Sequence, residues 1–151
     1  MENLNFWKTQ ERERDNYLNS AIDSCRRAIN LFEKNKNEQS KARGKYFLAS
    51  LLINYKSEIS FEAINSLKNS YCYYMCSSKR NKENDYFKTM RIYCLILEGE
   101  LNYKISQYSQ NNDNINKCRV LISKALNLAE EAKKEFLISK TRIYLEKVIE
   151  K

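Results

Sequence analysis

Two cysteines, Cys72 and Cys76, lie four residues apart in a segment with the apolar spacing of a helix, so their thiols would share one helical face. Two thiolates at this spacing could bind a metal ion or form a redox pair. A tetrahedral zinc site needs four ligands, however, and the chain contains no histidine and no Cys-x-x-Cys motif. We therefore predict no metal site, and we expect all the cysteines to pack as small hydrophobic residues in apolar helical stripes: Cys25, Cys72, Cys76, Cys94 and Cys118.

The remaining polar residues form no arrangement typical of an enzyme. The carboxylate pairs Glu98 with Glu100 and Glu130 with Glu131 point in diverging directions on a helix, so they cannot act together as general acid and base. Histidine, the commonest general base, is absent. No phosphate-binding loop, dinucleotide fingerprint, nucleophile elbow or His-Glu-x-x-His motif occurs. We expect a protein that is not an enzyme and uses no cofactor.

The densest aromatic and basic segment is the candidate site for a partner. Aromatic rings beside cations can stack bases and hold phosphates. Tyrosines can equally pack the end of a helical hairpin, with their hydroxyls at the surface. Packing is the favoured interpretation, and RNA binding is the alternative. The residues are Tyr71, Tyr73, Tyr74, Lys79, Arg80 and Lys82.

The charge of the chain does not decide between a nucleic acid and an acidic protein as the partner. Lysine and arginine number 27 against 19 aspartate and glutamate residues, which gives a formal net charge of +8. The excess is spread over both halves of the sequence, unlike a basic tail. It permits binding to nucleic acid or to an acidic protein without requiring either. A solvated basic surface without a polyanionic partner is the favoured interpretation.

The composition indicates that helices position these residues. Proline is absent and glycine occurs only twice, so an all-β fold would lack residues for its tight turns. Apolar residues recur every three to four positions almost throughout. We expect a single helical domain over residues 1–151, an all-α antiparallel stack of six helices with short loops. The expected helices cover residues 8–35, 39–57, 61–78, 85–109, 114–134 and 136–150.

Polar and apolar runs refine this picture. Ser60 is a suitable N-cap for the third helix. Residues 77–84 and 111–114 are rich in polar side chains and are predicted to be turns. The fourth helix is apolar on nearly every side between Ile92 and Leu97, so we expect it to be the most buried element.

Three of the expected helices share a pattern of small, large and small residues at steps of four and three. This pattern resembles the second helix of the tetratricopeptide repeat, in which the small residues let neighbouring helices approach closely. The three sets are Ala21, Cys25 and Ala28; Ala63, Leu67 and Ser70; and Cys118, Ile122 and Ala125.

The helices that precede the second and third sets partly match the first helix of the same family. Leu51 and Tyr55 have the spacing of its leucine and tyrosine, with Leu52 where the family has glycine, and a looser match follows at Leu97 and Tyr103. The three sets begin 42 and 55 residues apart, whereas the family repeats every ~34 residues, and the turn proline is missing. The chain is therefore similar to irregular tetratricopeptide-like domains with long helices.

The resemblance implies stacked helical hairpins, a segment of an α-solenoid, with a groove that holds a protein or peptide. The outer helices would lack a repeat partner, and such helices either carry a polar face or dock onto another chain. The last helix is apolar enough to dock, so Tyr144 and Val148 are added to the candidate partner-binding residues. Docking of this kind could build a homo-oligomer or a hetero-oligomer.

These observations predict a non-catalytic protein–protein interaction module, an adaptor or scaffold subunit. The alternative is a small basic helical RNA-binding subunit of a ribonucleoprotein complex. Residues 1–5 show no basic segment followed by an apolar run, and the longest apolar-rich stretch, 92–97, is too short to cross a bilayer. We expect a cytoplasmic protein without a membrane partner.

Overall fold

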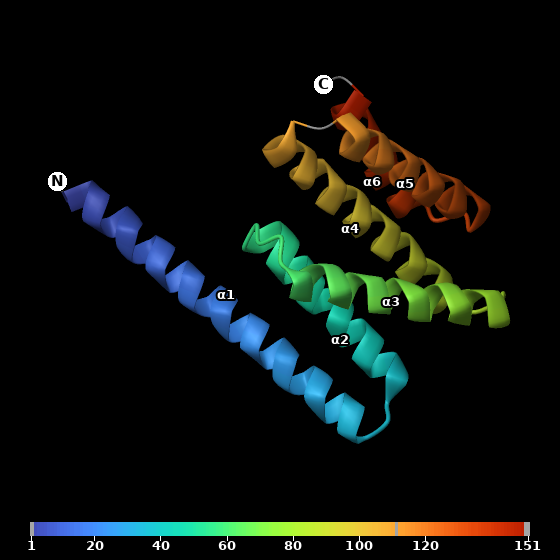
Figure 1. Cartoon of the computed structure of the whole chain (residues 1–151), viewed down its shortest axis with the longest axis horizontal. Helices are drawn as coiled ribbons and strands as arrows, with labels where there is room; N and C mark the ends of the chain where they lie inside the picture. The colour runs from blue at the N-terminus through green and yellow to red at the C-terminus, as the bar shows by residue number, and fades with distance from the viewer. Residues whose placement is uncertain (1, 111, 150–151) are drawn as a thin grey trace. The chain divides into compact units, whose positions relative to one another are not determined.

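The computed structural model describes residues 2–110 and 112–149, and every element within these ranges is helical, with no strand (Figure 1). Six α-helices follow one another, and a short π-helix, η1, continues α2. The all-α fold with six helices that was predicted from the sequence is confirmed. The elements are α1 (Glu2–Lys34), α2 (Glu38–Ser50), η1 (Leu51–Tyr55), α3 (Phe61–Arg80), α4 (Asp85–Ser109), α5 (Asn112–Glu131) and α6 (Glu135–Ile149).

Side-chain caps begin three of the helices. Asn37 before α2 and Asn84 before α4 each accept a hydrogen bond from the backbone N–H three residues later, at 3.1 Å in both cases. The Oγ of Ser60 accepts one from the backbone N–H of Ala63 at 3.2 Å. Each bond satisfies an N–H that has no partner within its helix. The predicted N-cap at Ser60 is confirmed.

Lysines take the place of glycine where α1 and α5 end. Lys36 and Lys133 adopt left-handed conformations, with φ of 54° and 55°. The N–H of Asn37 then bonds to the carbonyl of Phe32 at 2.8 Å, and a matching bond runs from Lys134 to Ala129 at 3.0 Å. This is the bond that closes a Schellman motif. The chain therefore reverses direction at these turns without glycine.

Several expected boundaries were wrong. The first helix begins at Glu2 rather than at residue 8, and the second stops being α-helical at Ser50 before η1. Residues 79–80 belong to α3 and residues 112–113 to α5, although they were predicted to lie in turns; residue 111 lies outside the described residues. Polar side chains on the solvent side of a helix have the same composition as a loop, which explains these errors.

The chain forms two compact units, Met1–Ser66 and Leu67–Lys151, and the division falls within α3. The expectation of a single domain over residues 1–151 stays a prediction.

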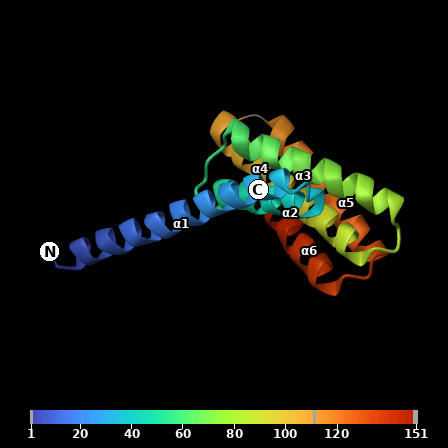
Figure 2. The ribbon, with the colours of Figure 1, turned by 90° about the horizontal axis from the view of Figure 1, so that it is seen from below.

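Unit 1 is built on the antiparallel pair α1 and α2 (Figure 1). A Cβ placed on Gly44 of α2 would lie 3.0 Å from Cγ1 of Ile29, so the two helices approach closely there. Arg26 of α1 donates hydrogen bonds at 3.1 and 2.6 Å to the two carboxylate oxygens of Glu62 in the first turn of α3. The N-terminal half of α1 extends past the end of α2 (Figure 2). Trp7, in this half of the helix, is exposed.

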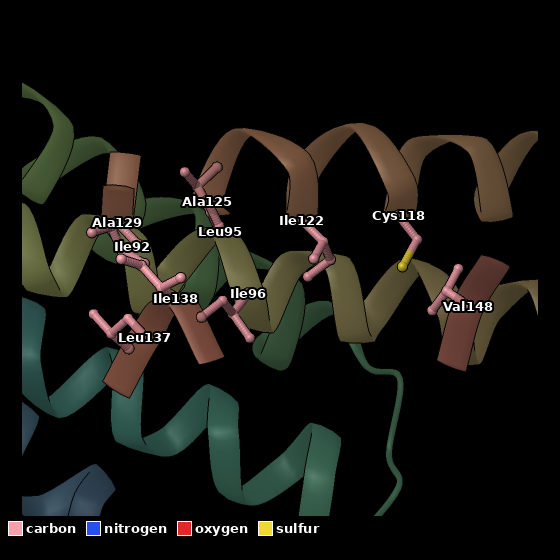
Figure 3. Close-up of a cluster of buried hydrophobic side chains, with 10 residues drawn as sticks. All are labelled: Ile92, Leu95, Ile96, Cys118, Ile122, Ala125, Ala129, Leu137, Ile138 and Val148. Atoms are coloured by element: carbon pink, nitrogen blue, oxygen red, sulfur yellow. The ribbon is translucent and has the colours of Figure 1, made fainter. Parts of the chain in front are cut away.

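Unit 2 has its core where α4, α5 and α6 pack together (Figure 3). The stretch Ile92–Leu97 is buried at every position except Tyr93, which is partly buried, so the predicted burial of this part of α4 is confirmed. Burial of apolar side chains is the main favourable contribution to folding. The core cluster consists of Ile92, Leu95, Ile96, Cys118, Ile122, Ala125, Ala129, Leu137, Ile138 and Val148.

The three small–large–small sets differ in burial. All members of the sets in α3 and α5 are buried: Ala63, Leu67 and Ser70, and Cys118, Ile122 and Ala125. In α1, Ala21 is exposed, and Cys25 and Ala28 are only partly buried. The buried residues of α1 are instead the larger Ile22 and Ile29. The packed face of α1 is therefore formed mainly by these larger residues, and Ala21 does not contribute to it.

Candidate functional site

Helix α6 presents an apolar face on the side opposite to its core contacts. Phe136 is 71% exposed and Ile143 is 52% exposed, and together with Tyr144 they line a shallow groove of about 330 Å³. Lys140 and Lys147 line the same groove. Residues seven apart lie on one face of a helix, about 10 Å apart along its axis. We call Phe136, Lys140, Ile143 and Lys147 the outer face of α6.

The core face of α6 fixes the helix in unit 2. Leu137, Ile138 and Val148 belong to the core cluster (Figure 3). Thr141 is also buried, and its hydroxyl donates to the carbonyl of Leu137 at 2.7 Å, so its polar group is satisfied within the helix. The two faces follow from helical periodicity, which separates 137, 141 and 148 from 136, 140, 143 and 147.

Polar contacts hold the middle and the C-terminal end of α6 to α5. Arg142 bonds to Glu130 at 3.0 Å. Arg119 donates from Nη2 to the carbonyl oxygen of Val148 at 3.5 Å, near the C-terminal end of α6. A cation at this end offsets the partial negative charge of the helix. The outer face is therefore carried by a helix that is anchored along its length.

Two predicted partner-binding residues of α6 lie on the core side. Val148 is 3% exposed, and the ring of Tyr144 packs edge-on against Tyr103 with centroids 6.4 Å apart. Burial raises the pKa of the Tyr144 hydroxyl, and it raises the pKa of the neighbouring Cys118 thiol to about 11. Val148 is thus unavailable to a partner, whereas Tyr144 is partly buried and also lines the outer-face groove. The apolar character of α6 was predicted correctly, but its exposed part lies at Phe136 and Ile143.

The aromatic and basic segment, residues 71–82, also contains both buried and exposed candidate residues. Tyr74 is completely buried, its hydroxyl lies 3.2 Å from that of Tyr86, and its ring contacts Phe87. Tyr74 is therefore part of the packing between α3 and α4, and its proposed contact with a partner was wrong. Tyr71 and Tyr73 remain partly exposed. The cations are exposed at the end of the hairpin: Lys79, Arg80 and Lys82.

The cysteines are not all buried, contrary to the prediction. Cys94 and Cys118 are completely buried, Cys25 is partly buried, and Cys72 and Cys76 are exposed on α3. All are free thiols. Within the described residues, no three side chains able to hold a metal come together.

The thiols should differ strongly in reactivity. Burial raises the pKa of Cys94 from 9.0 to about 12, so at pH 8 its thiolate fraction is about a thousandfold below that of an ordinary cysteine. A thiol reagent should react quickly with Cys72 and Cys76 and reach Cys94 and Cys118 only after unfolding. Mass spectrometry after timed labelling measures this order. The C72S/C76S variant should lose the fast reaction, and fast labelling of Cys94 would contradict the packing described.

Glu98 gives a prediction that depends on pH. Burial on α4 raises the pKa of its carboxyl, opposed by the charges of Lys124 and Lys68. The pKa of Glu98 is higher in the folded chain than its unfolded value near 4.5. Glu98 therefore contributes fully to the stability of the fold below pH 4.5, and this contribution is lost as the pH rises through the folded pKa. Glu98→Gln should therefore be more stable than wild type at neutral pH and equal to it near ~pH 4 in urea titrations. The exposed Glu146→Gln is the control, and an equal gain from it would contradict the assignment.

Comparison with known proteins adds no identification. No protein-family model matches the sequence, and no curated protein or solved structure matches the chain. Among the described residues, no helix combines the length and the apolar character needed to cross a bilayer.

Proposed function

We propose that this chain is a non-catalytic protein-interaction module that holds a segment of a partner protein on the outer face of α6. The observation that carries the proposal is the pair of exposed apolar side chains, Phe136 and Ile143, in one groove with two lysines. Single exposed apolar residues are ordinary on protein surfaces. Phe136 and Ile143 share one groove and lie seven residues apart on an anchored helix. This is the spacing of the apolar anchor residues in helix-in-groove recognition.

The lysines indicate the charge of the segment. Lys140 and Lys147 lie on either side of Ile143 along the helix. Lys140 also lies over the ring of Tyr93, with its Nζ 5.6 Å from the centroid, which places this cation at the groove. An acidic segment with two apolar anchors would pair its carboxylates with these lysines. The net charge of +8 favours the same class of partner.

A second copy of the chain suits this face poorly. In an antiparallel pairing of two α6 helices centred on Ile143, Lys140 of one copy would face Lys147 of the other, because these positions are nearly equidistant from the centre. Like charges opposed in an interface are destabilising. The outer face therefore fits a hetero-partner better than a homodimer.

The proposal extends to the fold type and the compartment. An irregular tetratricopeptide-like stack is supported by the buried small–large–small sets in α3 and α5. A cytoplasmic location is supported by the free thiols Cys72 and Cys76, whose exposure suits a reducing compartment.

A peptide selection tests the proposed function. A library of random 16-residue peptides is displayed and selected on the immobilised full chain, and in parallel on F136S/I143S. We expect the wild type to enrich acidic peptides that carry two apolar residues at helical spacing. Truncation of interface anchors commonly costs ~2 kcal/mol or more, so enriched peptides should bind the double variant at least about tenfold more weakly.

The matched control removes exposed apolar side chains elsewhere in unit 2. Y108S/V120S changes one such residue on α4 and one on α5, neither of which lines the outer-face groove. It should retain the enriched peptides. Equal loss in both double variants, or enrichment of peptides without excess negative charge, would refute this surface.

A second candidate function, binding of RNA, is favoured by the exposed Lys79, Arg80 and Lys82 on the same hairpin as the partly exposed Tyr71 and Tyr73. Counterion release predicts that log affinity falls with log salt by a slope of about −0.7 for each single-strand phosphate contacted. Filter binding to a mixed RNA pool over a salt series measures this slope. Undetectable or salt-independent binding would eliminate this candidate.

A further inference from the structure

A second concave feature of unit 2 lies apart from the outer face of α6. It is a cavity of about 270 Å³ at the end of the α3–α4 hairpin, closed on the other side by the C-terminal end of α5. A water molecule takes up ~30 Å³ in the liquid, so the cavity exceeds the space of a few waters. The polar side chains that line it are Ser78, Lys82, Lys88, Arg91 and Glu131.

The charges in the cavity do not cancel. Three cations, Lys82, Lys88 and Arg91, face one carboxylate, Glu131, which leaves two positive charges in excess. Among the described residues, none of these four groups forms an ion pair within 4.0 Å. The neighbouring charges Lys134 and Asp85 pair with each other. The excess positive charge is therefore available to a ligand.

Arg91 adds a donor that lacks an acceptor. Its Nε is shielded from solvent and has no hydrogen-bond partner. Leaving a buried donor unsatisfied costs roughly 1–3 kcal/mol, and more for a charged group. An oxyanion is the natural acceptor for a guanidinium, because its oxygens match the planar fork of N–H donors.

From this cavity we propose a binding site for a small phosphate monoester. A phosphate monoester carries a charge close to −2 at neutral pH, which matches the excess of two positive charges. Arg91, Lys88 and Lys82 would bind the phosphate oxygens. The side chains of Ile92 and Leu128, which also line the cavity, would contact the organic part of the ligand.

Isothermal titration calorimetry of the full chain tests the proposal with phenyl phosphate as the probe at pH 7.5. Phenyl sulfate has the same ring but a single negative charge, and inorganic phosphate has the charge without the ring. We expect phenyl phosphate to bind at least tenfold more tightly than phenyl sulfate. Weaker binding of inorganic phosphate is expected if the organic part occupies the apolar side of the cavity, and equal affinity would assign the site to free phosphate.

Variants of the cavity residues locate the site. Arg91→Gln should weaken phenyl phosphate binding at least tenfold, and Lys88→Gln should weaken it several-fold. Lys79→Gln removes the same charge from the same hairpin but does not line the cavity, so its affinity should stay within twofold of wild type. Circular dichroism checks that each variant folds. If Arg91→Gln does not fold, Lys88→Gln still tests the site.

Several outcomes would overturn the proposal. These are no binding at 10 mM probe, equal affinity for phenyl phosphate and phenyl sulfate, or equal losses in R91Q and K79Q. Binding of an RNA oligonucleotide that both variants weaken alike, without phenyl phosphate binding, would assign the cations to a polyanion surface instead. F136S/I143S should bind phenyl phosphate as the wild type does, because the two sites share no residue. Either proposal can therefore fail without the other.

Discussion

Replacing Tyr74 with alanine is expected to destabilise unit 2 by about 3–5 kcal/mol, the range for removal of a large buried aromatic side chain. Tyr74 is completely buried and is the largest of the fully buried side chains among the described residues. Its ring packs edge-on against Tyr86, with centroids 6.0 Å apart, and contacts Phe87. The variant would leave a cavity at the junction of α3 and α4. The free energy of unfolding, from urea titration followed by circular dichroism, measures the loss.

Two control variants separate packing from the other roles of Tyr74. Tyr74→Phe keeps the ring and removes only the hydroxyl contact with Tyr86 at 3.2 Å, so it should cost about 0.5–1.5 kcal/mol. Tyr108→Ala removes a tyrosine that is 74% exposed and should change stability by less than about 0.5 kcal/mol. A Tyr74→Ala variant as stable as Tyr108→Ala would contradict the described packing of α3 on α4.

The second large effect is expected at the contact between α4 and α5, where Gly99 meets Ile122. A Cβ on Gly99 would lie 2.5 Å from Cδ1 and 2.8 Å from Cγ1 of Ile122, which is itself completely buried. Ile122→Ala should cost about 2–5 kcal/mol because it opens a cavity in the core. Gly99→Ala should cost about 1–2 kcal/mol, since overpacking outweighs the gain in helix propensity.

The double variant Gly99→Ala/Ile122→Ala tests this contact, because the effect of Gly99→Ala on stability should change sign in the Ile122→Ala background. In the Ile122→Ala background the clashing atoms are gone, so the alanine at position 99 should stabilise the chain by up to about 1 kcal/mol through helix propensity. A double-mutant cycle in urea measures the coupling. Additive effects of the two substitutions would show that α4 and α5 do not approach each other at Gly99.

The sequence predicts most of the helices because their ends carry local signals. Ser60 has the side chain that an N-cap needs, and the apolar run Ile92–Leu97 has no polar side that could face solvent. The π-helical turn after Ser50 has no such signal, because its leucines and isoleucine would suit an α-helix equally well. Boundaries in polar stretches fail for a related reason, since an exposed helical turn and a loop share the same composition.

The candidate site was predicted less well because it depends on which face of each helix is covered. Tyr74 continues the buried stripe Ala63, Leu67 and Ser70 at the next step of four, so its burial was readable from spacing alone. Cys72 lies off that stripe, which accounts for its exposure.

On α6, the apolar residues fall on two faces, and the sequence does not show which face meets α5. The structure shows that Leu137 and Val148 are buried, which leaves Phe136 exposed. The cavity at Arg91 is harder still to predict, because its residues come from α3, the α3–α4 loop, α4, α5 and the turn after α5.

Recognition of an acidic segment by the outer face of α6 can be tested directly by reversing the charge of that face. The K140E/K147E variant keeps Phe136 and Ile143 and replaces the two lysines that line the groove. In the peptide selection, the wild type should enrich peptides of net negative charge, and K140E/K147E should enrich basic peptides with the same apolar spacing. If both proteins enriched peptides of the same charge, recognition of an acidic segment by Lys140 and Lys147 would be contradicted.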